Sequence, residues 1–124
     1  MFEISVHGEF RAPHCLRYPD GRVEPRHEHC WQVTATYAGP TLDNIDVLLD
    51  FAVTKADLAR VLATLDGHDL NEVPALAGRN PSAEVLAQRI AEQLQRDWPN
   101  AVRLRCVAVE EEPGCVASYE LSPG

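Results

Sequence analysis

The sequence lacks long apolar runs, an apolar N-terminal leader and an excess of basic residues, and each absence excludes a class of protein. No apolar run approaches the ~20 residues that span a bilayer, and the first residues lack the basic and then apolar plan of a signal peptide. We therefore expect a cytoplasmic protein. Lys and Arg number 11 against 19 Asp and Glu, so the net charge is −8. This negative charge disfavours nucleic acid and anionic membranes as partners.

Paired C-x-x-C spacings are also missing. The sequence has four cysteines, and a reducing compartment argues against disulfides between them. We interpret them as small buried residues. Cys15 and Cys30 each lie beside a histidine discussed below. Neighbouring residues of a strand point to opposite faces, so neither cysteine is expected to share a metal with that histidine.

What remains is the composition of an ordinary globular protein. With 124 residues, 45% of them hydrophobic, the chain is long enough to bury one core and too short for two. We predict a single domain over residues 1–124.

Three histidines lie where two strands are expected to meet. Apolar and polar residues alternate over 31–37 and over 2–10, and such alternation predicts strands. His27 and His29 precede the second strand, and residues two apart in an extended chain share a face at about 7 Å. If the strands pair as an antiparallel hairpin, His14 comes beside them. Three imidazoles with one open position describe a catalytic zinc site. The alternative is that half-exposed histidines fall together by chance.

Four arginines lie in or beside the loop that joins these strands: Arg11, Arg17, Arg22 and Arg26. A basic patch next to a metal would suit an anionic ligand. We prefer the simpler interpretation that they are solvated loop charges.

Two helices are expected between the two pairs of strands. Thr54 and Asp57 resemble a capping box ahead of a helical stripe, and Gly67 is the expected left-handed cap at its end. The second helix is expected to start with Asn80 as cap and Pro81 in its first turn. Its stripe is Ala83, Leu86, Ala87, Ile90 and Leu94.

Two more alternating segments, residues 102–109 and 116–121, complete the expected elements. The order strand-strand-helix-helix-strand-strand predicts an α+β fold, a four-stranded antiparallel sheet with two helices on one face. The other face would need a partner, so we expect oligomerisation.

Short motifs within these elements resemble those of the 6-pyruvoyl tetrahydropterin synthase and 6-carboxytetrahydropterin synthase family of tunnelling-fold (T-fold) proteins. The family's F-x-A-x-H corresponds to residues 10–14, and its H-G-H to residues 27–29. The other matches are D-F with a following lysine at 50, 51 and 55, D-H-x-x-L-N at 66–71, N-P-T-x-E at 80–84 and E-T-P-x-x-x-A-x-Y at 111–119.

The resemblance implies an assembly and a set of ligands. Family members form trimers whose sheets close into a barrel, and two trimers stack, which implies a homohexamer with sites at subunit interfaces. Zinc on the three histidines polarises the side-chain oxygens of a dihydropterin triphosphate. A glutamate matching Glu111 binds the guanidine-like edge of the pterin, together with backbone around Ser82 and Ala83.

The chain departs from the family at two catalytic positions. A cysteine and an aspartate-histidine pair move protons in the family, but Val23 stands at the cysteine position and Gly67 follows Asp66 at the histidine position. Each such group contributes about 10²–10⁴-fold to the rate. We therefore predict a homologue that binds a pterin-like ligand and lacks the standard synthase activity.

Two alternatives remain open. In one, the protein is an active pterin triphosphate lyase in which His68, one position later than the family's histidine, and Cys15 replace the missing groups. Asp66 keeps its place, and Gly67 lets the backbone redirect His68. The simpler interpretation of His68 is a polar loop residue. In the other, the protein is a metal-free, non-catalytic oligomer, and Glu28 in place of the glycine of H-G-H disturbs the metal ligands.

Overall fold

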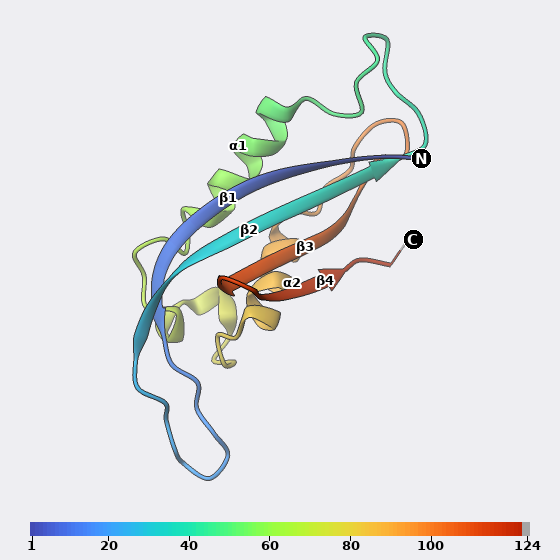
Figure 1. Cartoon of the computed structure of the whole chain (residues 1–124). Coiled ribbons are helices and arrows are strands. Elements are labelled where there is room, and N and C mark those ends of the chain that lie inside the picture. Colours follow the sequence, from blue (N-terminus) through green and yellow to red (C-terminus); the bar gives the residue numbers. More distant parts are fainter. Residues whose placement is uncertain (123–124) are drawn as a thin grey trace.

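The computed structural model describes residues 1–122 and has the element order expected from the sequence. Its strands are β1 (Phe2–His14), β2 (His27–Gly39), β3 (Arg103–Glu112) and β4 (Cys115–Glu120), and its helices are α1 (Phe51–Leu62) and α2 (Ala83–Leu94). Two short 3-10 helices, η1 (Leu70–Glu72) and η2 (Pro74–Leu76), lie between α1 and α2. The sheet has the order β1-β2-β3-β4, and every neighbouring pair is antiparallel (Figure 1).

The long β1–β2 hairpin is the element that places the histidines. Its register runs from Phe2 opposite Gly39 to His14 opposite His27. The apolar positions of β2 that alternate in the sequence are fully buried, as at Trp31 and Tyr37. A slip of one residue would turn all these side chains to the other face, so burial fixes the register. The alternation therefore also fixes which residues meet at the end of the hairpin.

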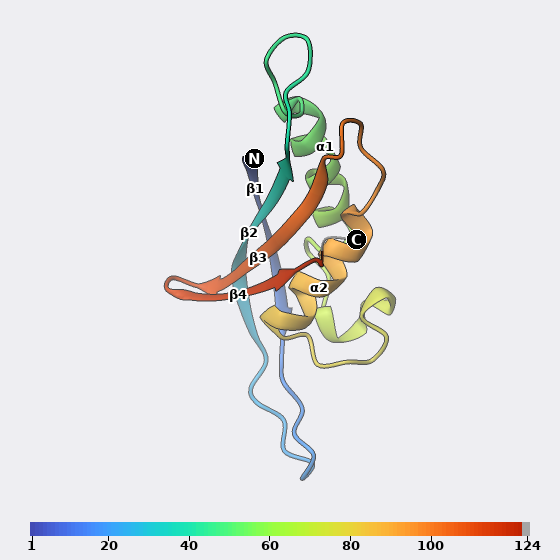
Figure 2. The same ribbon diagram turned by 90° about the vertical axis from the view of Figure 1, so that its right-hand side faces the viewer.

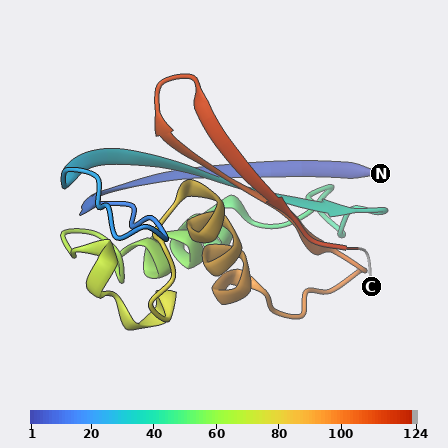
Figure 3. The same cartoon turned by 90° about the horizontal axis from the view of Figure 1, so that it is seen from below.

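Both helices cover the same face of the sheet, as predicted. Figures 2 and 3 show α1 and α2 on one side, and they show the β3–β4 turn projecting away from that side. α1 packs against β1, while α2 packs against β3 and β4. The helical stripes and the buried strand residues form one core. No helix among residues 1–122 is long and apolar enough to cross a membrane.

The start of α1 differs from the expectation. Its cap is Asp50, whose carboxylate accepts the backbone N–H of Ala52 at 2.8 Å. Thr54 lies in the first turn, where its hydroxyl donates to the carbonyls of Asp50 and Phe51. The predicted capping box was wrong because Asp57 pairs with Arg60 instead, at 3.0 Å. An aspartate is as good a cap as a threonine, so the earlier residue starts the helix.

The end of α1 also comes earlier than expected. The helix stops at Leu62, and its C-cap Ala63 has right-handed backbone angles. Gly67 has the predicted positive φ, 75°, but it belongs to the turn that follows. That turn closes on the outer edge of β1. The N–H of Gly67 donates to the carbonyl of Arg11 at 2.7 Å, and the carboxylate of Asp66 accepts the N–H of Arg11 at 2.9 Å.

α2 is capped by Ser82 rather than by Asn80. The Ser82 hydroxyl accepts the N–H of Val85 at 3.2 Å. The side chain of Asn80 is used elsewhere: it accepts the N–H and donates to the carbonyl of Arg17, both at 2.8 Å. Asn71 makes the same pair of bonds, each 2.9 Å, with the backbone of Cys15. Two asparagines from the helical segment therefore hold the loop that follows His14.

The face of the sheet away from the helices is polar. Its side chains bond to one another across the strands, as in Ser5 with Thr36 at 2.9 Å and His7 with Gln32 at 2.6 Å. Gln32 also donates to Glu9 at 2.9 Å. Because this face has few apolar side chains to bury, its burial alone gives no reason for a partner, and the expectation that a partner covers it stays a prediction. The prediction of an oligomer rests on the family resemblance.

Tyr37 gives a prediction of alkaline sensitivity. Its hydroxyl is buried without a hydrogen-bond partner among residues 1–122, and burial, reinforced by the Asp57 carboxylate, raises its pKa to about 12. Between pH 10 and 12 the unfolded chain loses this proton and the folded chain keeps it, so stability falls as the pH rises. We expect Tyr37→Phe to remove about 2 kcal/mol of that loss. Urea unfolding from pH 8 to 11.5 measures how the free energy of unfolding depends on pH, and Tyr18→Phe is the exposed control. Equal pH slopes of this free energy in wild type and Tyr37→Phe would contradict the prediction.

Candidate metal and ligand site

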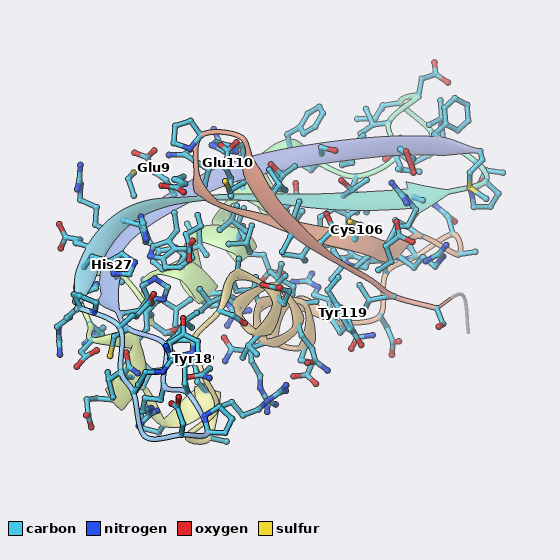
Figure 4. All side chains as sticks on the ribbon, turned by 60° about the horizontal axis from the view of Figure 1, so that its bottom comes forward. Glu9, Tyr18, His27, Cys106, Glu110 and Tyr119 are labelled. Atoms are coloured by element: carbon cyan, nitrogen blue, oxygen red, sulfur yellow. The ribbon has the colours of Figure 1, made fainter. Side chains whose placement is uncertain are left out.

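Three histidines converge at the loop end of the β1–β2 hairpin, beside residues 15–26. His14 ends β1 opposite His27, and His29 lies two residues along β2 on the same face. One ligating atom from each ring lies within 4.8 Å of the others, as the strand pattern predicted. The ring of Trp31 forms the floor of the cluster, with centroids 4.8 Å from His14 and 5.2 Å from His29. Figure 4 labels His27, which enters the cluster from the first residue of β2.

Backbone carbonyls fix the protons of two of these rings. His14 donates from Nδ1 to the carbonyl of Pro81, and His27 donates from Nδ1 to the carbonyl of Pro25, both at 2.8 Å. The lone pairs are then on the two Nε2 atoms, which lie 3.1 Å apart. Two nitrogens bound to one tetrahedral zinc are about 3.4 Å apart. The rings of His14 and His27 are therefore oriented as metal ligands, because the nitrogen that would not bind the metal is held by a hydrogen bond.

His29 completes the set with a free acceptor atom. Its Nε2 is buried and has no hydrogen-bond partner among the described residues. Burial lowers the pKa of His29; Glu111 opposes this shift, and the two other histidines add to it. The ring is therefore neutral near pH 7 and offers a lone pair. Glu28, on the reverse face of the strand, pairs with Arg11 at 3.4 Å instead of turning toward the cluster.

Glu111 joins the histidines to a neighbouring cavity. Its Oε1 atom lies 3.3 Å from Nε2 of His14, which is 1% exposed. The carboxylate also lines a cavity of about 340 Å³ between the start of α2 and β4, where it faces Ser82 and Ala83. The three residues predicted to contact a pterin therefore surround one cavity.

The family relationship follows from comparison with known proteins. A family model described as 6-pyruvoyl tetrahydropterin synthase matches residues 3–122. The chain belongs to this family. Its four-stranded sheet with two helices is the T-fold of the 6-pyruvoyl tetrahydropterin synthases, so the predicted fold is confirmed.

Solved synthase structures share this fold at low sequence identity. The 6-pyruvoyl tetrahydropterin synthase of Caenorhabditis elegans is 20% identical over 98% of this chain and 96% of its own, with a TM-score of 0.83. The enzyme of Plasmodium vivax is 19% identical over 97% of each chain, with a TM-score of 0.79. A form of the Plasmodium vivax enzyme in which a catalytic glutamate is replaced by alanine is 17% identical over 97% of each chain, with a TM-score of 0.73.

Within one chain of this protein, the residues predicted to transfer protons do not lie beside the three histidines. Asp66 accepts the N–H of Arg11 at the outer edge of β1, where it lines a different cavity, between β1 and α1, with Lys55. His68 is exposed in the following loop. Neither residue lines the cavities beside the histidines. If they act on a ligand of the histidine cluster, a neighbouring copy of the chain has to supply them.

Three of the four arginines in or beside the loop between β1 and β2 form ion pairs. Arg11, Arg22 and Arg26 are each paired with a carboxylate, those of Glu28, Asp20 and Asp69. The interpretation of the four arginines as solvated loop charges stays a prediction; Arg17, the fourth, is exposed in the loop. Acidic residues dominate instead: Glu110, Glu111 and Glu112, at the end of β3, line a second cavity of about 290 Å³ beside His29. Figure 4 labels Glu110 near the β3–β4 turn, with Glu9 on the same helix-free side.

Sequence analysis missed the carbonyls of Pro25 and Pro81 that orient the rings. Pro25 lies two residues before His27, so its carbonyl is within reach of the His27 ring, and the sequence spacing could have predicted this bond. Pro81 had no such signal, because it reaches His14 across 67 residues of chain. Its role depends on where α2 begins relative to β1.

Proposed function

We propose that this protein binds a pterin-like heterocycle beside a zinc ion and does not carry out the standard synthase reaction. The observation that supports it is the cavity of about 340 Å³ that Glu111 shares with Ser82 and Ala83, next to the three histidines. Ligand pockets begin at about 300 Å³, so a bicyclic heterocycle fits this size. The two oxygens of one carboxylate match two N–H donors that point the same way, as on the guanidine-like edge of a pterin.

The histidine cluster would hold the zinc ion. Its three neutral imidazoles, with two rings oriented by carbonyls, are the ligand set of a metal site with one open position. When bound, zinc acts as a Lewis acid that polarises an oxygen of the ligand. Around it, Glu111 would orient the heterocycle, and Trp31 would exclude water from the buried side.

Two positions lack the groups that the standard synthase reaction requires. Val23 carries no ionisable group and is 56% exposed in the loop. Gly67 has no side chain, and the neighbouring Asp66 is already hydrogen-bonded to the backbone of β1. Proton transfer to and from the reacting carbons therefore has neither of the usual carriers at these positions.

We propose a homohexamer, a dimer of trimers, as the working assembly. The separation of Asp66 and His68 from the cluster within one chain supports it, because a neighbour could supply them. The outer edges of β1 and β4 are the free edges of the sheet through which strands of neighbouring copies could pair.

Isothermal titration calorimetry with pterin tests the heterocycle site. We expect saturable binding by the wild type and a loss of about 100-fold or more in Glu111→Ala, because two charge-assisted hydrogen bonds disappear. Glu9→Ala is the matched control: its carboxylate accepts from Gln32 on the helix-free face and lines neither cavity beside the histidines. Absence of pterin binding by the wild type would favour the non-catalytic, metal-free oligomer.

One observation favours a second candidate function, a phosphate-eliminating pterin lyase that uses a carboxylate. A solved relative has a catalytic glutamate, and Glu24 directly follows Val23 in this chain. The Glu24 carboxylate accepts the N–H of Leu16 at 2.8 Å, and Leu16 lines the same cavity as Glu111. Sequence analysis considered His68 and Cys15 for proton transfer and passed over Glu24.

A further inference from the structure

We propose that Tyr37, Asp57 and Trp98 form a second binding site, which takes one neutral hydroxyl group, either of a water molecule or of a small polyol. The site lies at the other end of the sheet from the histidine cluster. Tyr37 pairs with Ile4 near the start of β1, whereas the histidines gather where β1 ends. This second site depends on neither the metal ion nor the heterocycle proposed above.

Three buried polar atoms without a partner mark the site. They are the hydroxyl of Tyr37, Oδ2 of Asp57 and the indole N–H of Trp98, and none of them has a hydrogen-bond partner among residues 1–122. Tyr37 is fully buried, and Asp57 is 8% exposed. Buried polar groups of native proteins are almost always paired, and buried tyrosine and tryptophan usually find a partner for their polar atom. Three such atoms in one place therefore indicate a partner from outside the chain.

Packing brings these side chains together from three parts of the chain. The rings of Tyr37 in β2 and of Trp98, which follows α2, meet edge to face with centroids 5.7 Å apart. The guanidinium of Arg96 lies 4.0 Å over the Trp98 ring, and its Nη1 atom is 3.8 Å from Oδ1 of Asp57 in α1. Figure 1 shows the segment between α2 and β3 at the same end of the molecule as the end of β2. Arg96 therefore bridges Asp57 and Trp98 on the solvent side of the group.

Two cavities beside Arg96 provide room for a guest molecule. One of about 690 Å³ is lined by Arg96 and Trp98, and one of about 440 Å³ is lined by Arg96 and Asp57. Arg96 is the side chain that the two cavities share, and it is long enough to move aside. The atoms of a small polyol beyond the bound hydroxyl would therefore lie in one of these cavities.

The chemistry of the three polar atoms selects a neutral hydroxyl group. The indole N–H of Trp98 only donates and the Asp57 carboxylate only accepts, so the guest atom has to do both. A hydroxyl oxygen accepts from Trp98 and from Tyr37, and its own proton goes to Asp57. Burial and the Asp57 carboxylate raise the pKa of Tyr37 to about 12, so Tyr37 keeps its proton near pH 7. A cationic guest is not required, because Arg60, at 3.0 Å, and Arg96 already balance the charge of Asp57.

Nuclear magnetic resonance of the isotope-labelled full chain tests the site, with glycerol as the probe. The chain has two tryptophans. The indole N–H of Trp31 donates to the carbonyl of Ala12 at 3.1 Å, so it is the internal control. In water alone we expect the indole proton of Trp98 to show a cross-peak to a bound water molecule, and that of Trp31 to show none. If a polyol takes the site, glycerol should shift the Trp98 resonance saturably and remove the water cross-peak.

Tyr37→Phe is the decisive variant, because it removes the hydroxyl and keeps the ring. It should weaken the Trp98 water cross-peak, and it should lower any glycerol affinity about fivefold, since one of three hydrogen bonds is lost. Tyr18→Phe, in the exposed loop, is the matched control and should behave as wild type. Trp98→Phe assigns the resonance by removing it.

The outcomes separate the two guests from a failed site. A Trp98 water cross-peak without a glycerol shift would identify water as the guest, and a saturable glycerol shift would identify a polyol; both support the site. Neither signal at Trp98, equal glycerol shifts at Trp98 and Trp31, or an unchanged response in Tyr37→Phe would each overturn it. Asp57→Asn, which replaces an accepting oxygen, serves with the same expected loss if Tyr37→Phe does not fold.

Discussion

Purified protein incubated with dihydroneopterin triphosphate is expected to give no pyruvoyl or carboxy product above the enzyme-free control. By the family resemblance, Val23 stands where a thiol is expected and Gly67 where an imidazole is expected, and each missing group is worth about 10²–10⁴-fold in rate. The acidic surroundings of the cluster add to this, because Glu110 and Glu112 repel a triphosphate near the histidines. Chromatography with fluorescence detection measures the amount of pyruvoyl or carboxy product.

Robust turnover would contradict the proposed function and favour the lyase. In that case Glu24→Gln should lower kcat by about 10²-fold or more, since it removes the proton carrier and keeps the shape. Glu28→Gln is the matched control, because its carboxylate pairs with Arg11 on the exposed surface. A Glu24→Gln variant with wild-type kcat would return His68 and Cys15 as the candidates for proton transfer.

Loss of zinc from His14→Ala is the second large effect. Wild-type protein purified without chelator is expected to contain one zinc ion per chain. Removal of one imidazole of three should weaken binding about 100-fold, because a bound zinc ion contributes on the order of 10–16 kcal/mol shared among its ligands. The variant also loses the bond to Pro81 and the packing on Trp31, so its Tm should fall as well. Elemental analysis and chelator competition measure the metal.

The other two histidines provide the controls for this experiment. His7 lies on the helix-free face with Gln32 and Thr34, and His68 is exposed in the loop after α1. Neither His7→Ala nor His68→Ala should change the zinc content. If the wild type holds no zinc and binds none when it is added, the metal-free oligomer is the correct interpretation.

The sequence predicted what depends on local periodicity. Alternation along β1 and β2 determined the hairpin, and the hairpin brought His14 to His27 without further information. Helix ends were predicted less well. Asp50 and Ser82 are the caps in place of Thr54 and Asn80, because several suitable residues lie within a few positions and tertiary contacts select among them.

The detailed chemistry of the site depends on contacts between distant segments. The contact of Glu111 with His14 and the carbonyl of Pro81 require β3 and α2 to be placed against the end of β1, and no local pattern contains that placement. The basic loop shows the same limit. Arg26 lies one residue from a predicted metal ligand, but its partner Asp69 comes from the segment after α1.

The two asparagine clamps determine when the site can form during folding. Asn71 holds the backbone of Cys15 across 56 positions of sequence, and Asn80 holds that of Arg17 across 63. Loops of that length close late, after local strands and helices have formed. A nascent chain that has made only its first hairpin therefore has the three imidazoles but not the clamped loop or the Pro81 carbonyl. Full affinity for the proposed metal ion should accordingly be a property of the finished chain, and metal capture should then report the last stage of its maturation.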